Sequence, residues 1–236
     1  MTTKRKWRLL LAAAILIAVW IVRAPILRGL AGLLIVDQPT DNFDYVCIVA
    51  WGQNGDGDRC YDVAGDLRRE KPSRRILLVG QSPSRVERIG VVPSFEAISR
   101  GQLGSRGVPQ DAISLIRGGS WDDWANARSL AAWLRDHPGS FVLLLCSQFH
   151  SALVRHALDA VLDPADAARV FIRALPGRLC DDTNWWTLRC GYREFGGSWL
   201  MQFQSWLGGG DVPQSPERSA DDYERDFLQS LPERTP

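Results

Sequence analysis

Short apolar runs alternate with amphipathic stretches along the middle of the chain. The runs predicted to form strands are 45–51, 75–79, 112–116, 141–146 and 169–174, and helical spacing follows at 59–70, 94–106, 122–136 and 151–162. Strands that are apolar throughout are buried on both faces of a sheet, and strand–helix alternation favours parallel pairing with right-handed crossovers. The pattern therefore predicts an α/β fold: a three-layer, Rossmann-like, doubly wound and mainly parallel sheet.

The N-terminal 36 residues have a different pattern. A basic segment with Lys4, Arg5, Lys6 and Arg8 precedes an uncharged apolar run, residues 9–22. As a helix the run is about 21 Å long, and continuing it to residue 27 with Arg23 snorkelling to the interface fills a hydrocarbon core of roughly 30 Å. A cleaved signal peptide has a similar start, but Arg-Ala-Pro at 23–25 is a poor cleavage site. The sequence favours an uncleaved transmembrane anchor.

Cations flank the anchor unevenly, with more before it than after it, where Arg23 and Arg28 lie. This favours a single-pass inner (plasma) membrane protein with a cytoplasmic N-terminus and a periplasmic globular domain. Residues 1–36 are then a basic cytoplasmic tip, the transmembrane anchor and a connecting segment, and residues 37–207 form the Rossmann-like domain. Residues 208–236, rich in Pro, Ser, Glu, Arg and Asp, form a disordered polar tail. A net charge of +1, with no basic stripe among aromatics, argues against nucleic acid as a partner.

The turn after the run 141–146 carries the main candidate chemistry. Ser147 and His150 lie between a predicted strand and a predicted helix, where ligands of open α/β sheets bind. In one interpretation Ser147 caps the helix and His150 contacts a ligand; in the other His150 is a packed or solvated residue. A hydrolase triad is disfavoured because the context Cys146-Ser147-Gln148 lacks the Gly-x-Ser-x-Gly elbow.

Other candidate ligand-binding residues begin predicted helices or their loops. Gly52 and Gln53 open a glycine-rich loop after the first predicted strand, although this loop matches no P-loop and contains carboxylates that repel phosphate. Arg59, at the start of the next helix, is the favoured anion partner. Asn126 lies near the start of the helix 122–136.

Cysteines and tryptophans leave alternatives open. Cys47 and Cys146 lie within apolar runs and are expected to be buried thiols. Cys180 and Cys190 either pair in an oxidising compartment or stay unpaired, and no Cys/His spacing predicts a metal site. The side chains of Trp185 and Trp186 either cover the open edge of the sheet, which we favour, or form a platform for a sugar.

Several short motifs occur in order between residues 36 and 207. They are Asp44 before the first strand, Arg59 with Ala64 and Leu67, Glu96 with Leu103 and Gly107-Val108-Pro109, the turn from Ser120 to Ala127, Ser147-x-x-His150 with Arg155, and Trp185-Trp186 before Gly191. Together they resemble the YdcF/SanA/ElyC-like family of bacterial envelope proteins, a domain-of-unknown-function family.

The chain departs from this family at three places. The glycine cluster after the first strand is reduced, Leu153 stands where the family has an arginine, and Asn126 or Ala125 stands where an acidic residue is expected. The resemblance implies a Rossmann-like domain tethered to the inner membrane, with a role in cell-envelope biogenesis or barrier function. Some relatives are linked to peptidoglycan or surface-polysaccharide precursors, and a cytosolic relative is described as binding S-adenosylmethionine.

These observations predict a membrane-anchored envelope protein that binds a phosphorylated or nucleotide-like small molecule, such as a lipid-linked glycan intermediate. The expected ligand-binding residues are Gly52, Gln53, Arg59, Asn126, Ser147 and Arg155. His150 is the candidate acid–base residue and Glu96 its candidate partner; the sequence identifies no cofactor and leaves open whether the site catalyses a reaction. One alternative is a non-catalytic scaffold that recruits envelope proteins. Another is an S-adenosylmethionine-binding protein, which lacks support because no glycine fingerprint with an acidic ribose partner is present.

Overall fold

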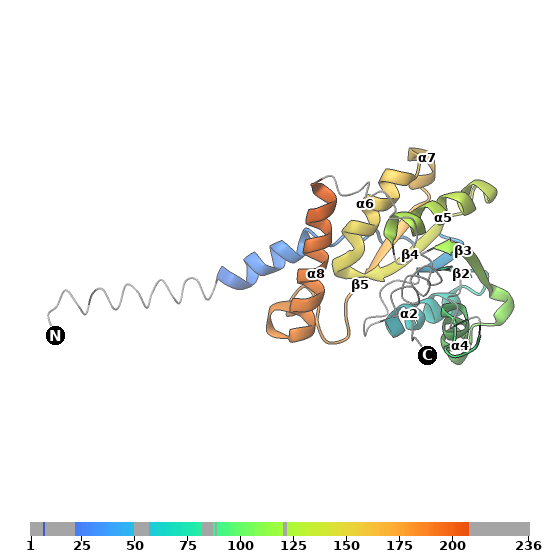
Figure 1. Cartoon of the computed structure of the whole chain (residues 1–236), viewed down its shortest axis with the longest axis horizontal. Coiled ribbons are helices and arrows are strands. Elements are labelled where there is room, and N and C mark those ends of the chain that lie inside the picture. The colour runs from blue at the N-terminus through green and yellow to red at the C-terminus, as the bar shows by residue number, and fades with distance from the viewer. Residues whose placement is uncertain are drawn as a thin grey trace, which may run out of the picture.

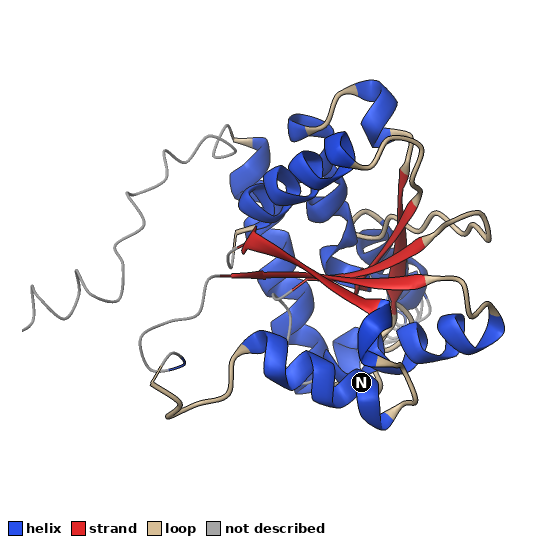
Figure 2. Ribbon diagram, turned by 90° about the vertical axis from the view of Figure 1, so that its right-hand side faces the viewer, coloured by secondary structure: helices blue, strands red, loops and turns tan. Residues whose placement is uncertain are grey.

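A five-stranded parallel sheet forms the centre of the computed structural model, which describes residues 7, 22–49, 57–81, 87, 89–119 and 122–207 (Figure 2). The strands are β1 (Tyr45–Val49), β2 (Arg75–Gln81), β3 (Ile113–Gly119), β4 (Val142–Ser147) and β5 (Val170–Leu175). Their order is β3-β2-β1-β4-β5, and every neighbouring pair is parallel. The predicted α/β fold with a parallel, Rossmann-like sheet is confirmed.

Helices cover both faces of the sheet (Figure 1). Side chains of α2 (Gly57–Glu70) and α4 (Phe95–Ser105) share one core cluster, and those of α5 (Asp123–Asp136) and α6 (Ser151–Val161) share the other. The remaining helical elements are η1 (Gln110–Ala112), η2 (Gln148–His150), α7 (Pro164–Ala167), η3 (Trp185–Thr187) and α8 (Arg189–Trp206).

Successive strand residues supply the two cores in turn. In β1, Val46 and Ile48 face α2 and α4, whereas Cys47 and Val49 face α5 and α6. Cys47 and Cys146 are buried thiols, as predicted. Burial raises the pKa of Cys47 to about 12 and that of Cys146 well above its ordinary value, because a thiolate loses its hydration there. None of the five cysteines takes part in a disulfide in the structure, so Cys180 and Cys190 are not paired with each other.

The chain reverses its direction across the sheet at β1. It moves from β1 through β2 to β3 on one side, and then returns to add β4 and β5 on the other side. The connections after β1 and β4 therefore lead to opposite faces. In open α/β sheets this arrangement leaves a crevice at the carboxyl ends of the two strands, where ligands bind.

A short N-terminal segment docks on the edge of the domain. Residues 22–32 are helical, and the chain then follows β5: Gln38 N donates to Ile172 O at 2.7 Å, and Ala174 N donates to Asp37 Oδ1 at 3.0 Å. None of the helices in the described residues is long and apolar enough to span a bilayer. Most of the predicted anchor, residues 9–21, and the tail 208–236 lie outside the described residues.

Trp185 joins the N-terminal helix to α8. Its indole is buried, stacks on Phe195 with ring centroids 3.7 Å apart, and donates Nε1–H to Leu27 O at 3.3 Å. The tryptophan pair does not cover the β5 edge of the sheet as expected: Asp37 and Gln38 bond to that edge, and Trp185 packs against α8. Because the Trp185 ring is buried, it offers no platform for a sugar.

Close packing of α8 on η3 makes Gly191 a sensitive position. A Cβ there would lie 2.5 Å from Trp185 Cα, whereas a Cβ at Gly196 meets nothing within 4 Å. We expect Gly191→Ala to lower the free energy of unfolding by about 1–3 kcal/mol. The matched change Gly196→Ala should raise it by up to about 1 kcal/mol, because alanine is the better helix former. Denaturant unfolding followed by circular dichroism measures both; equal effects would contradict this packing.

Candidate active site

His150 and Asp123 form a buried hydrogen-bonded pair at the carboxyl end of the sheet, which is an ion pair when the imidazole is protonated. The Nε2 atom of His150 lies 3.0 Å from Oδ2 and 3.2 Å from Oδ1 of Asp123. The two side chains are only 14% and 8% exposed. A buried carboxylate beside Nε2 fixes the orientation of the imidazole ring. The pair has the geometry of an oriented acid–base group.

The start of α5 directs Asp123 toward the histidine. Asp122 is the N-cap, and its carboxylate accepts from Trp124 N at 3.3 Å and Ala125 N at 3.1 Å. With the cap supplied by Asp122, Asp123 as the first helical residue faces His150. The positive N-terminal end of α5 also favours a carboxylate at this position.

The start of α6 positions His150. The turn η2 separates β4 from α6, so that His150, not Ser147, is the N-cap residue of α6. The prediction that Ser147 caps this helix is therefore wrong: its side chain makes no capping hydrogen bond. Instead, Leu34 O accepts from Ala152 N at 3.1 Å.

Ser151 fixes this turn to the N-terminal segment. Its buried hydroxyl lies 2.7 Å from Gln148 O and 3.3 Å from Leu34 O, and it accepts from Val36 N at 2.8 Å. The segment that follows the N-terminal helix is thus bonded to the residue next to His150. Ser147 itself is half-buried as the last residue of β4.

A small pocket adjoins the ion pair on the α5/α6 face of the sheet. Asp123 and Asn126 are its polar lining residues, and Val49, Val79 and Val154 belong to its apolar lining. Asn126 is buried, one helical turn after Asp123. The structure thus brings Asn126, a predicted ligand-binding residue, beside the carboxylate that holds His150. Its free volume of about 10 Å³ has room for about one water molecule, so a larger ligand has to bind in the open crevice above it.

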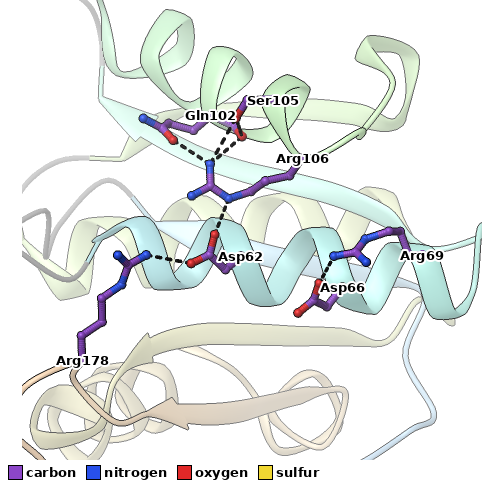
Figure 3. A network of polar contacts seen from close by, with 7 residues as sticks. All are labelled: Asp62, Asp66, Arg69, Gln102, Ser105, Arg106 and Arg178. Atoms are coloured by element: carbon purple, nitrogen blue, oxygen red, sulfur yellow. Dashed lines mark hydrogen bonds and ion pairs between the residues drawn. The ribbon is translucent and has the colours of Figure 1, made fainter.

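Arg59 lies on α2, the helix that follows β1 across the crevice. Its Nη1 donates to Gly177 O, 3.2 Å away, in the segment after β5. A neighbouring network fastens the same segment to α2 (Figure 3): Asp62 accepts from Arg178 Nη2 at 2.8 Å and from Arg106 Nε at 2.6 Å. The hydrogen bond from Arg106 is the main cause that holds the pKa of Asp62 below its ordinary value of 3.8, and Arg178 adds to it.

Two predicted site residues are not brought to His150. Glu96 lies on α4, which packs on the opposite face of the sheet, and it pairs with Arg100 at 2.9 Å. Arg155 pairs with Asp159 and donates Nη1–H to Val170 O at 3.2 Å.

Strand register places Arg155 far from the crevice. Val170 is the first residue of β5 and is paired with Val142 at the start of β4, whereas Ser147 ends β4. The guanidinium of Arg155 is therefore bonded at the amino end of the sheet. Gly52 and Gln53 lie outside the described residues.

Asp123 is the site residue that sequence reasoning missed. The signal available was the doublet at 122–123, because one aspartate suffices to cap a helix. Among the described residues, no three His, Cys, Asp or Glu side chains are grouped as metal ligands would be. Comparisons of the chain with protein-family models, curated proteins and solved structures gave no match.

The Asp62 network predicts a pH-dependent stability. Because the folded state lowers the pKa of Asp62, its contribution is present above pH 3.8 and is lost as the pH falls through the lower folded-state value. We expect Asp62→Asn to lower the thermal unfolding midpoint at about pH 7, with a difference from the parent chain that shrinks toward about pH 3.

The control is Asp66→Asn on the same helix. Asp66 pairs with Arg69 within α2, at an exposed position (Figure 3), where ion pairs contribute little. Its midpoint should stay close to that of the parent chain at both pH values. A loss equal to that of Asp62→Asn would contradict the role of Asp62 in joining separate elements.

Proposed function

We propose that this chain is a membrane-anchored cell-envelope protein whose crevice between β1 and β4 binds a phosphorylated or nucleotide-like small molecule. The observation that carries the proposal is the buried ion pair of His150 and Asp123 at the carboxyl end of the sheet. Buried charged pairs beside a pocket are typical of functional sites, because their burial costs free energy that stability alone seldom requires.

Helix polarity supports an anionic ligand. The strands are parallel, and α2, α5 and α6 each follow a strand in the chain. Their N-termini therefore lie at the carboxyl ends of the strands. N-termini of helices favour negative groups. Arg59, near the start of α2, is the cation that meets the ligand's negative charge. A guanidinium has five N–H donors, and the bond to Gly177 uses one of them.

The ion pair supports acid–base chemistry on that ligand. With Nε2 held by Asp123, His150 takes a proton at Nδ1 from a water or hydroxyl and returns it to a leaving oxygen. The family resemblance implies an acidic residue before Ala127, where this chain has Asn126 or Ala125. Asp123 lies one helical turn earlier on the same face and supplies the missing carboxylate.

The envelope location rests on different observations. The apolar run 9–22 after a basic segment is typical of an inner-membrane anchor. The family resemblance adds a role in cell-envelope biogenesis, with a lipid-linked or nucleotide-linked glycan precursor as the ligand class.

Ligand binding by the full-length chain in detergent tests this function. A thermal-shift panel should include nucleotides, nucleotide-sugars, isoprenyl phosphates and S-adenosylmethionine. We expect a phosphorylated member to raise the unfolding midpoint, and His150→Ala and Asp123→Asn to reduce that shift, with roughly tenfold weaker binding for the loss of one charged contact.

The matched control is His156→Ala, an exposed histidine one and a half turns further along α6, which should leave the shift unchanged. Binding of S-adenosylmethionine alone would support the alternative class. A folded chain that binds no member of the panel, or binds one equally well without His150, contradicts the proposal.

A further inference from the structure

The helix α8 packs Phe195 and Trp199 against the domain but leaves other large apolar side chains exposed. It buries small and polar residues, namely Gly191, Ser198, Gln202 and Ser205. It exposes large apolar ones, namely Tyr192, Leu200, Met201, Phe203 and Trp206, at 42–59% of their area. A helix that faces water has the opposite arrangement. The exposed face of α8 is therefore built to contact an apolar partner.

The N-terminal helix carries a second exposed apolar stripe. Val22, Ile26, Leu30 and Leu33 are 38–58% exposed and lie at helical spacing on one side. Leu27, between them, packs on the cluster that contains Trp185 and Phe195 of the α8 region. Both surfaces thus belong to the same end of the molecule, where the chain enters the domain (Figure 1). We call them together the apolar end surface.

We propose that the apolar end surface lies in the interface of an anionic phospholipid bilayer. This inference rests on the membrane anchor of the proposed function. The stripe begins at Val22, the last residue of the run 9–22, so a bilayer that holds the run meets this end of the domain first. Continuity of the chain therefore supports lipid as the occupant.

Charge on the two helices matches the same occupant. Arg23 and Arg28 are exposed on the first helix, and Arg189 and Arg193 on α8, while Glu194 is the one acidic residue in 22–33 and 188–207. Cations flanking apolar and aromatic side chains are typical of helices that lie in an anionic membrane interface. Trp206 and Tyr192 add the amphipathic rings that prefer this depth.

The site is coupled to this surface by short connections. Leu34, just after the stripe, is hydrogen-bonded to Ser151 and Ala152, which adjoin His150. Phe149, in the same turn as His150, is buried in the cluster with Trp185. A bilayer against the apolar end surface therefore lies close to the turn that carries the histidine, as a lipid-linked phosphate requires.

Fluorescence quenching by lipid tests the inference on the full-length chain. The chain is reconstituted in vesicles of phosphatidylcholine and phosphatidylglycerol, with or without bromine on the acyl chains. We expect bromine to quench emission from Trp206, so that Trp206→Phe loses part of the quenched emission. The control Trp133→Phe, on α5 against Tyr45, should lose only unquenched emission.

Extraction at alkaline pH separates this inference from the anchor. An embedded chain whose Trp206 is unquenched overturns the inference and leaves the proposed function standing; self-association would then indicate a second copy as the occupant. A chain that is extracted yet shows quenched Trp206 before extraction supports the inference and contradicts the anchor. A chain that neither embeds nor shows quenching overturns both.

Discussion

Parallel pairing of β1 with both β2 and β4 is the constraint on which the rest of the structure depends. Parallel strands bring all carboxyl ends to one edge, and the reversal at β1 sends the next connections to opposite faces. On one of these faces, α5 and α6 begin side by side at that edge. Asp123 and His150, distant in sequence, meet there within 3.0 Å. The ion pair is therefore a product of sheet topology, and local sequence only decides which side chains stand at the two helix starts.

The element pattern could be predicted because strands buried on both faces must be apolar throughout, whereas amphipathic helices alternate at a different period. The order of the strands in the sheet could not be predicted from this pattern. The alternation of strands and helices shows that the strands are parallel, but it does not show which helices share a face. The sequence alone therefore cannot tell whether Glu96 or Asp123, both acidic residues near a helix start, lies beside His150. Glu96 lies on α4, which packs on the face of the sheet opposite to α5 and α6. Arg155 pairs instead with Asp159, one helical turn away, at the i,i+4 spacing that brings two side chains of a helix together.

Two further features depend on packing that residue patterns do not contain. The turn η2 moves the start of α6 to His150, which removes Ser147 from the capping position. In α8, buried Gly191 allows close approach to η3, and Leu200, Met201, Phe203 and Trp206 are left exposed. A sequence with apolar residues on several sides of a helix does not say which side is buried. The neighbouring Trp185, stacked on Phe195, decides it.

We propose that Asp123 orients His150 for a phosphorylated ligand in the crevice. The most direct measurement is the tautomer of each histidine in the full-length chain, from long-range ¹⁵N–¹H correlation spectra, with and without a nucleoside diphosphate or isoprenyl phosphate. The chain has only three histidines, so assignment is simple. We expect a proton on Nε2 of His150, and His150 ring shifts that respond to the ligand while those of His156 do not. A His150 without a proton on Nε2, or a His150 ring that no phosphorylated ligand perturbs, would contradict this proposal.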